Sequence, residues 1–593
     1  MSEHKTVVID IEETEKAQLD EHSGLSEIEV SGVLSVKNVS EKSRIWNVRV
    51  LLGDTRDRTN IGEETIPAGE VDAGGRWDTT YDVSAKAPIL TLTEVFDTCE
   101  EVKTEEPHWA YAFGKDNPVK MTITLKNETD GQIDNIVLNK TIPSELTEIT
   151  IDEVTSGTAE FDEGTGVVVW KDFVIYPQEE STVVIKASGR VKDVDAKGAG
   201  EMVVTYRGEE QTRSVLAPDM TALTEFLAGI ESAETEPNSW ECTLECSNES
   251  DLVVRLDKAE VYLEPEDGGD KEKMIDEAPA VELAPNDEWR SSFEVTSKSP
   301  PKCTQEIIYT PTNVVTKRVL GTIDKTPQLV PVYRIEYSKT FDPPKVASFD
   351  KTPVEVTIEV TNAGSAKLNE VQVLDNLPDD IMPPTSEYVE VFVRGDKYDG
   401  EMEIAIDPDD QDPDSPHTLS VKLSNLKDSV GELEPDETMR INYSIMTWKS
   451  RPEKEYPSPI RCLANTYPPG LEAEIASDED GHKIGVVYKK RRISAKKGIN
   501  KGSETGEYIV QLVIENKGEV TVENVRVTDW IPEDFEFVSV EPEDLEPSQA
   551  AADGGTNLGW IFERMNPEDK KKIRVTVRGE GEYERREPEV ISD

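Results

Sequence analysis

The stretch Val356-Thr-Ile-Glu-Val-Thr-Asn362 decides the fold of this chain, because the same pattern returns elsewhere at fixed spacing. Apolar residues stand two, four and six positions before the Asn, which is the period of a β-strand with one buried face. Met121-Thr-Ile-Thr-Leu-Lys-Asn127 and Val510-Gln-Leu-Val-Ile-Glu-Asn516 repeat that pattern. Three copies of one strand predict an internal repeat.

Each copy continues in the same way after its Asn. A second alternating strand follows, and a proline stands sixteen residues after the Asn; these positions are Ile136/Leu138 with Pro143, Val371/Val373 with Pro378, and Val525/Val527 with Pro532. Trp170 and Trp560 stand seven residues before a later proline in the first and last copies, whereas Asp428 occupies that position in the middle copy. We expect both tryptophans to fill sandwich cores.

A shorter module type occurs twice. Its markers are Trp77, Val83, Lys86 and Pro88, which recur 212 residues later as Trp289, Val295, Lys298 and Pro300. Short alternating strands separated by Asn, Gly, Asp and Pro turns predict an all-β fold. We expect tandem Ig-like antiparallel β-sandwiches that form an elongated multi-domain rod.

The repeats predict the domain boundaries. They are an acidic N-terminal tail at 1–25, a short sandwich at 26–105, long repeat 1 at 106–215, a second short sandwich at 216–325, long repeat 2 at 326–485 with an acidic insertion around 395–417, and long repeat 3 at 486–593. A short helix over Asp219–Ala228, with Asp219 as its N-cap, is expected to precede the second short sandwich.

The long copies resemble a known family. Val360-Thr-Asn-Ala-Gly364 with Val371-Gln-Val-Leu-Asp-Asn-Leu-Pro378 is similar to the Ig-like conserved repeat called domain of unknown function eleven, found in archaeal and bacterial surface proteins. The last copy is nearly as close, and the first copy departs, with Asn139 where Asp375 and Asp529 stand. The resemblance implies a β-sandwich protein with a binding or structural role at the cell envelope, and it implies no catalytic residues.

The net charge of the chain limits the classes of partner that it can bind. It has 122 acidic and 64 basic residues in 593, a formal net charge of −58. Binding nucleic acid or an anionic membrane surface needs clustered cations, so we expect neither partner. No run of 18 apolar residues predicts a membrane segment, and residues 1–25 lack the apolar core of a signal peptide. These features predict a cytoplasmic protein, with the cell surface as the alternative that the resemblance implies.

One acidic loop offers a candidate metal site. Five carboxylates within eight residues could supply oxygen ligands to calcium; they are Asp407, Asp409, Asp410, Asp412 and Asp414. A solvated acidic loop explains the same residues. No other cofactor is expected.

A basic segment stands out against the acidity. It comprises Lys489, Lys490, Arg491, Arg492, Lys496 and Lys497. One hypothesis is docking onto an acidic protein partner or a second copy of this chain. The other is that these residues form the first strand of the last module, where basic side chains block unwanted strand pairing.

Reactive residues give little indication of catalysis. The five cysteines are Cys99, Cys242, Cys246, Cys303 and Cys462, and an odd number does not predict a disulfide framework. Cys242 and Cys246 share one strand face and could be reduced core thiols, or one of them could bridge to Cys303. The five histidines have no catalytic or metal-binding spacing. We therefore expect a non-enzymatic scaffold or spacer acting through protein contacts or self-association; the alternative is an exported envelope or adhesion protein that binds proteins or glycans.

Overall fold

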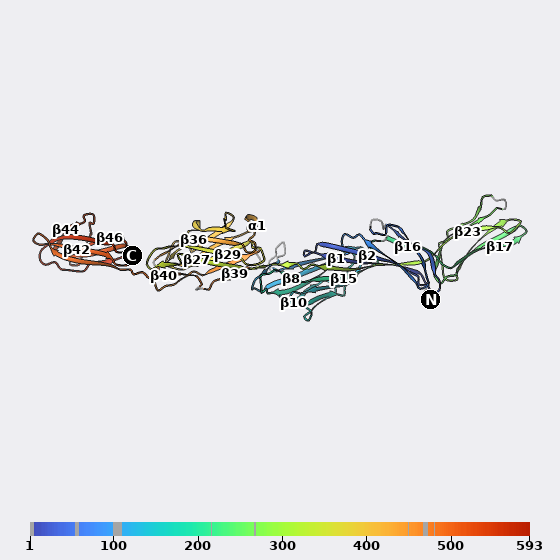
Figure 1. The fold of residues 1–593 in the computed structure, drawn as a ribbon, viewed down its shortest axis with the longest axis horizontal. Helices are drawn as coiled ribbons and strands as arrows, with labels where there is room; N and C mark the ends of the chain where they lie inside the picture. The colour runs from blue at the N-terminus through green and yellow to red at the C-terminus, as the bar shows by residue number, and fades with distance from the viewer. Residues whose placement is uncertain are drawn as a thin grey trace. The chain divides into compact units, whose positions relative to one another are not determined.

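The computed structural model describes residues 5–53, 58–98, 109–214, 216–265, 269–448, 450–466, 472–478 and 481–592. These residues contain 48 β-strands but only one α-helix and one 3₁₀-helix. Figure 1 draws the chain almost entirely as strands. The chain divides into two compact units, unit 1 at 1–191 and 196–330, and unit 2 at 192–195 and 331–593. The predicted all-β fold of tandem Ig-like antiparallel sandwiches is confirmed, while the arrangement of the modules into a rod stays a prediction.

Unit 1 contains three sandwiches. The first is built from β1 Val7–Leu19, β2 Leu25–Lys37, β3 Ile45–Gly53, β4 Thr65–Val71, β5 Arg76–Val83 and β16 Leu216–Leu223. The second is built from β6 Leu90–Asp97, β8 Asn117–Asn127, β9 Ile133–Thr141, β10 Leu146–Val154, β11 Thr158–Asp162, β12 Val167–Lys171, β13 Glu180–Gly189 and β15 Met202–Glu209. The third is built from β17 Phe226–Glu236, β18 Ser239–Asn248, β19 Val254–Leu263, β20 Glu272–Glu277, β21 Val281–Leu283, β22 Glu288–Thr296 and β23 Cys303–Pro311. Short strands β7 Tyr111–Ala112, β14 Lys197–Gly198 and β25 Leu329–Val330 complete the unit.

One long strand, β24 Asn313–Lys325, joins the first two sandwiches of unit 1. It pairs in parallel with β1 and antiparallel with β15, which creates an eight-stranded sheet in the order β11-β12-β9-β15-β24-β1-β2-β5. Residues that the sequence assigned to the second short module therefore belong to a sheet shared by two others. Unit 1 is interwoven, unlike a string of separate modules.

Unit 2 contains two sandwiches. The first comprises β26 Val332–Tyr333, β27 Ile335–Asp342, β28 Lys345–Ala347, β29 Pro353–Asn362, β30 Glu370–Leu377, β31 Ile381–Met382, β32 Glu390–Val393, β33 Asp396–Lys397, β34 Met402–Asp407, β35 His417–Leu423, β36 Thr438–Thr447, β37 Tyr456–Pro457, β38 Ile460–Asn465, β39 Ala473–Ala476 and β40 Lys483–Val487, with the 3₁₀-helix Ser386–Tyr388 and α1 Leu426–Ser429. The second comprises β41 Ile493–Lys501, β42 Glu507–Asn516, β43 Val522–Pro532, β44 Phe535–Glu541, β45 Ser548–Ala552, β46 Gly555–Met565, β47 Lys570–Gly579 and β48 Glu589–Ile591.

Strand alternation builds the cores. In β42 the inward residues Val510, Leu512 and Ile514 are at most 1% exposed, and they pack with Trp560 from the facing sheet β45-β46-β43-β48. Trp170 is fully buried in the second sandwich of unit 1. Both tryptophans fill cores, as the sequence predicted.

The prediction of an acidic tail at 1–25 is wrong. Residues 7–19 form β1, which pairs with β2 on one side and β24 on the other. Two charges hid its period-2 pattern, because Glu13 and Glu15 point inward and are fully buried. Hydroxyl groups make that burial tolerable, since Tyr81 donates to Glu13 at 3.2 Å and Tyr206 donates to Glu15.

The predicted helix at Asp219–Ala228 is also wrong. Residues 216–223 form β16, which pairs with β3, and residues 226–236 form β17. Met220 and Ala222, two positions apart, are both buried in the first core of unit 1. This spacing is the period-2 pattern of a β-strand. Helix propensity in a short segment is weak, and hydrogen bonding to the edge of a sheet, here β3, overrides it.

Candidate functional site: repeated asparagines, buried ion pairs and surface segments

Every sandwich is closed by the same buried asparagine. The five residues are Asn38, Asn127, Asn248, Asn362 and Asn516, and each is at most 2% exposed. In each, the side-chain amide donates to backbone carbonyls on two segments, and the side-chain oxygen accepts from the N–H two residues ahead. The repeated Asn is therefore an internal clasp that ties a strand end to its neighbouring loop.

A buried lysine–aspartate pair crosses the core of the first sandwich of unit 2. Lys339 on β27 and Asp375 on β30 come from opposite sheets, and their fully buried side chains approach to 2.5 Å (Nζ to Oδ1). Tyr443 donates its hydroxyl to the other oxygen of Asp375. Ser458 Oγ lies 2.7 Å from Lys339 Nζ and 3.2 Å from Asp375 Oδ1. Burial lowers the pKa of Lys339 from its ordinary value, against the attraction of Asp375.

The last sandwich repeats this pair. Lys497 Nζ on β41 lies 2.8 Å from Asp529 Oδ1 on β43, and both side chains are at most 1% exposed. The carbonyl of Trp530 accepts from the same Nζ at 3.3 Å, and Tyr583 Oη lies 3.4 Å away. Burial raises the pKa of Asp529, although Lys497 opposes the shift. The prediction that Lys497 is an interaction residue is wrong, because its position on β41 points it into the core.

The second sandwich of unit 1 contains a related cluster in which the two signs of charge are exchanged, so that the first strand carries the carboxylate and the later strand the lysine. Glu94 on β6 faces Lys140 on β9 at 2.6 Å and Lys325 on β24 at 2.9 Å, each distance being Nζ to a different carboxylate oxygen. All three side chains are at most 1% exposed. Counted from the repeated Asn, it is Lys140 and not Asn139 that occupies the place of Asp375 and Asp529, which corrects that alignment.

The other members of the basic segment lie at the surface or near it. Lys490, Arg492 and Lys496 are exposed, and Lys489 and Arg491 are half-buried. The segment leads into β41, which is an edge strand of the sheet β41-β42-β47-β44. Residues 489–492 precede β41, and only Lys496 and Lys497 lie on it. The segment therefore forms the first strand of the last module only in part, and its role as an interaction surface stays a prediction.

The five aspartates of the predicted calcium loop do not converge. Asp407 ends β34, and the side chains of Asp410 and Asp412 each accept a backbone N–H two residues ahead. Asp410 also contacts His417 Nε2 at 2.8 Å. Among the described residues no group of three or more His, Cys, Asp or Glu could hold a metal ion. The loop geometry gives calcium no support, and the site stays a prediction.

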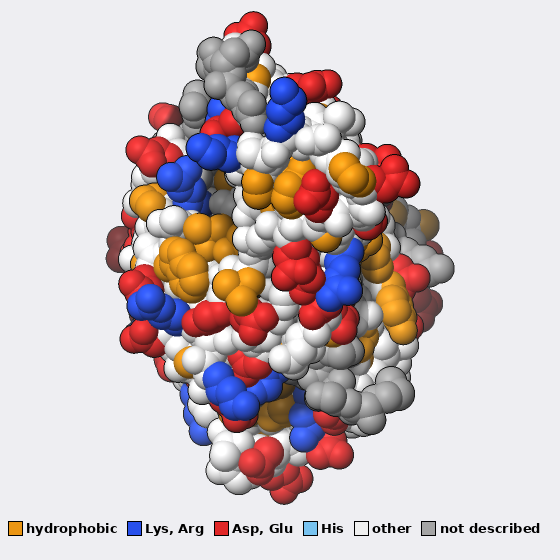
Figure 2. All heavy atoms as spheres, turned by 90° about the vertical axis from the view of Figure 1, so that its right-hand side faces the viewer, with side chains coloured by type: hydrophobic (Ala, Val, Ile, Leu, Met, Phe, Trp, Pro, Cys, Tyr) orange, Lys and Arg blue, Asp and Glu red, His pale blue; other side chains and the backbone are white. Residues whose placement is uncertain are grey.

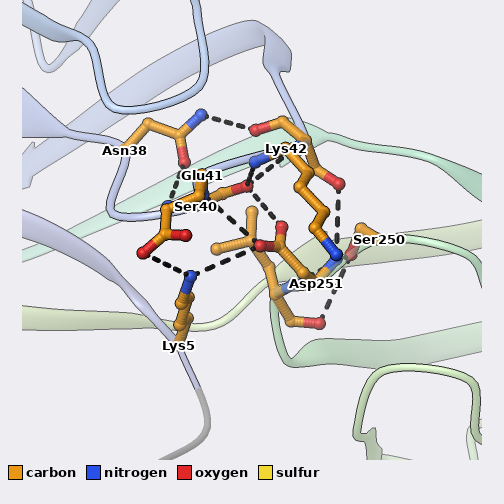
Figure 3. Close-up of polar contacts among 9 residues, drawn as sticks. Lys5, Asn38, Ser40, Glu41, Lys42, Ser250 and Asp251 are labelled. Carbon is orange, nitrogen blue, oxygen red and sulfur yellow. Dashed lines mark hydrogen bonds and ion pairs between the residues drawn. The ribbon is translucent and has the colours of Figure 1, made fainter.

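Two equivalent turns of unit 1 meet in a polar junction (Figure 3). The turn after Asn38 presents Ser40, whose hydroxyl donates to Asp251 in the turn after Asn248. Lys5 lies between them, 3.4 Å from Glu41 and 3.6 Å from Asp251 (Nζ to carboxylate oxygen). Burial opposes ionisation, but the hydrogen bonds lower the pKa of Asp251, so the carboxylate stays charged and holds the two short modules together.

The described cysteines are free thiols. Cys242, Cys246 and Cys462 are buried and Cys303 is half-buried; Cys99 lies outside the described residues. Burial raises the pKa of Cys246 to about 11 and that of Cys462 to about 12. These values keep both thiols protonated and unreactive at neutral pH, as expected for core residues.

The surface carries mixed charge. Figure 2 shows acidic, basic and hydrophobic side chains interspersed on the face that it views. A hollow of about 1110 Å³ in unit 1 is lined by residues that include Tyr176, Gln211, Arg213 and Lys317. No helix among the described residues is long and apolar enough to cross a membrane.

Comparisons with known proteins give weak likenesses. No family model matches the chain, and no curated protein matches it. Similar solved structures include the yeast delta-COP-I mu-homology domain with a Dsl1 peptide (12% identity, 56% of this chain and 100% of that chain, TM-score 0.22) and the Corynebacterium diphtheriae major pilin SpaA (11%, 56% and 90%, 0.20). The C-terminal domain of the Streptococcus pyogenes antigen I/II-family protein AspA is a third (7%, 66% and 100%, 0.25). At these TM-scores the likeness says nothing about function.

Proposed function

We propose that this chain is a structural protein of the cell surface, whose sandwich modules act as scaffold or spacer and present binding faces to other proteins. The observation that carries the proposal is the Asn clasp, which is rebuilt in all five sandwiches. Because the same buried residue recurs in every sandwich, each sandwich is a copy of one module. Each added copy lengthens the chain's folded part and adds exposed surface. Such modules bind through exposed loops and edge strands.

The surface location is supported by the sequence resemblance of the long modules to repeats of archaeal and bacterial surface proteins. A second candidate is a cytoplasmic scaffold built from the same modules. The free thiols of Cys242, Cys246, Cys303 and Cys462 favour it, because an oxidising compartment promotes disulfides. Both candidates share the structural role and differ only in location.

The basic segment provides a candidate electrostatic contact between two copies of this chain. A chain of net charge −58 presents acidic surface to any copy of itself, and an exposed cluster around Lys490 and Arg492 provides the complementary charge. Self-association through this cluster should weaken as salt screens the attraction.

Sedimentation velocity of the full chain at low and high salt tests the proposed contact. We expect association at low salt that is lost in K489Q/K490Q/R492Q and retained in K571Q/K572Q, a control on the exposed face of β47. Association that is insensitive to both salt and the first variant would contradict the proposed contact. So would a chain that stays monomeric throughout.

A further inference from the structure

The three long modules place an ion pair at one shared pair of positions. Glu94, Lys339 and Lys497 each pair across the first two strands with a residue that stands four before the repeated Asn; those partners are Ile123, Ile358 and Leu512. Their ionic partners all stand thirteen residues after that Asn, at Lys140, Asp375 and Asp529. All three long modules thus keep a lysine in contact with a carboxylate, although the strand that carries the lysine differs between them.

A buried ion pair is a costly way to fill a core. Removing both charges from water is unfavourable, and apolar residues of similar volume often stabilise a core as well or better. The same low dielectric favours the neutral forms of both groups, an amine and a carboxylic acid. Burial lowers the pKa of Lys339 in the first pair of unit 2 and raises the pKa of Asp529 in the second pair, and each shift favours the neutral form of that one group.

We propose that Lys339 with Asp375, and Lys497 with Asp529, condense into amide bonds that link the two sheets of each unit 2 sandwich. The neutral amine Nζ attacks the carboxyl carbon Cγ, one Nζ–Cγ bond forms and one Cγ–O bond breaks. The oxygen leaves with two protons as one water molecule. Nothing is oxidised or reduced, and no other reactant is consumed.

The first pair has the groups that this step needs. The hydroxyl of Tyr443 holds Asp375 Oδ2, the oxygen that becomes the amide carbonyl, and hydrogen bonding there polarises the carboxyl group. Lys339 Nζ lies beside Oδ1, the leaving oxygen. Ser458 Oγ contacts both atoms and so can carry the proton from nitrogen to oxygen. Both reacting side chains are fully buried, so bulk water has no access for the reverse reaction.

In the second pair, the carbonyl of Trp530 and the hydroxyl of Tyr583 both lie within hydrogen-bonding distance of Lys497 Nζ, so they orient the amine. The Glu94 cluster differs in one decisive way. Each of its carboxylate oxygens faces its own lysine, Lys140 or Lys325, whereas one oxygen of Asp375 is held by the hydroxyl of Tyr443. With a cation at both oxygens, no neutral hydroxyl donor holds the carboxyl group of Glu94 for attack, so we expect this site to stay an ion cluster and to serve as an internal control.

Mass spectrometry of the denatured full chain tests the proposal. We expect an intact mass below the sequence mass by two molecules of water, after allowance for the N-terminal Met. Proteolysis should release two branched peptides, one joining the segments around Lys339 and Asp375 and one joining those around Lys497 and Asp529. Lys339→Arg keeps a cation but cannot condense in the same way, so it should lose one water only. Lys140→Arg should lose two, as the natural chain does.

Each other outcome overturns a defined part of the proposal. A chain at its full sequence mass without branched peptides contains ion pairs only. A deficit of one water overturns the bond whose branched peptide is missing. A branched peptide that contains Glu94 overturns the role assigned to the double cation. Because the natural chain gives the primary result, a variant that fails to fold leaves the test intact.

Discussion

Replacing Asn516 with Ala tests the clasp that repeats through the chain. Asn516 is fully buried, and its amide donates to the carbonyls of Val520 at 2.9 Å and Met565 at 3.0 Å. Its side-chain oxygen accepts the N–H of Gly518 at 2.9 Å. At about 1 kcal/mol for each buried hydrogen bond, the loss amounts to about 3 kcal/mol of unfolding free energy. With a urea slope of about 2 kcal/mol per molar for a domain of this size, the unfolding midpoint falls by about 1.5 M.

Hydrogen exchange of the full chain in rising urea, read by mass spectrometry, measures this change locally. Peptides from β42 and β47 should lose protection at lower urea in Asn516→Ala, whereas peptides from β29 in the neighbouring sandwich should not change. Asn500→Ala is the matched control, because Asn500 is exposed on β41 of the same module. Coincident midpoints for the two variants would refute the clasp, since a buried and an exposed Asn would then contribute equally.

Three further predictions concern charge, thiols and pH. Lys497→Glu removes the contact with Asp529 and the proposed bond, and it leaves two buried carboxylates together, so it should destabilise the last module by at least about 3–5 kcal/mol in urea unfolding. Adding Asp529→Lys restores a buried ionic contact and should recover part of that loss, because Glu94 and Lys140 already show the reversed order; a double variant no better than the single one would contradict this. Cys462, with its pKa raised by burial to about 12, should alkylate only after denaturation, and rapid labelling of the native chain at pH 8 would argue against its burial. Hydrogen bonds, first from Lys273, lower the pKa of Glu260 from 4.5 to about 2. The contribution of the Glu260 carboxylate to stability is therefore complete above pH 4.5 and is lost as the pH falls toward 2. Hydrogen-exchange protection of β19 that does not fall over this pH range would contradict the lowered pKa.

The repeated strand was visible in the sequence because its apolar residues alternate without interruption. Val356, Ile358 and Val360 are all buried on β29, so the pattern and the structure agree residue by residue. The role of Asn362 was less visible. Sequence predicts a turn at such a position, but which carbonyls its amide reaches depends on the loop that returns beside it.

The errors arose where charged residues face inward. Glu13 and Glu15 interrupt the apolar pattern of β1, and their partners Tyr81, Tyr206 and Ser214 lie far away in the sequence. The same reason hid the Lys497–Asp529 pair, because a lysine within a basic segment reads as surface. The fixed spacing of Asp529 from the repeated Asn was a usable signal, whereas the strand register of its lysine required the structure.

The measurement that tests the central claim most directly is protease digestion of this protein on intact and on lysed cells, followed with an antibody. The proposed surface role predicts that intact cells lose the full-length chain, with cleavage at exposed loops and survival of sandwich-sized fragments. Protection until lysis would contradict the surface location and leave an internal scaffold.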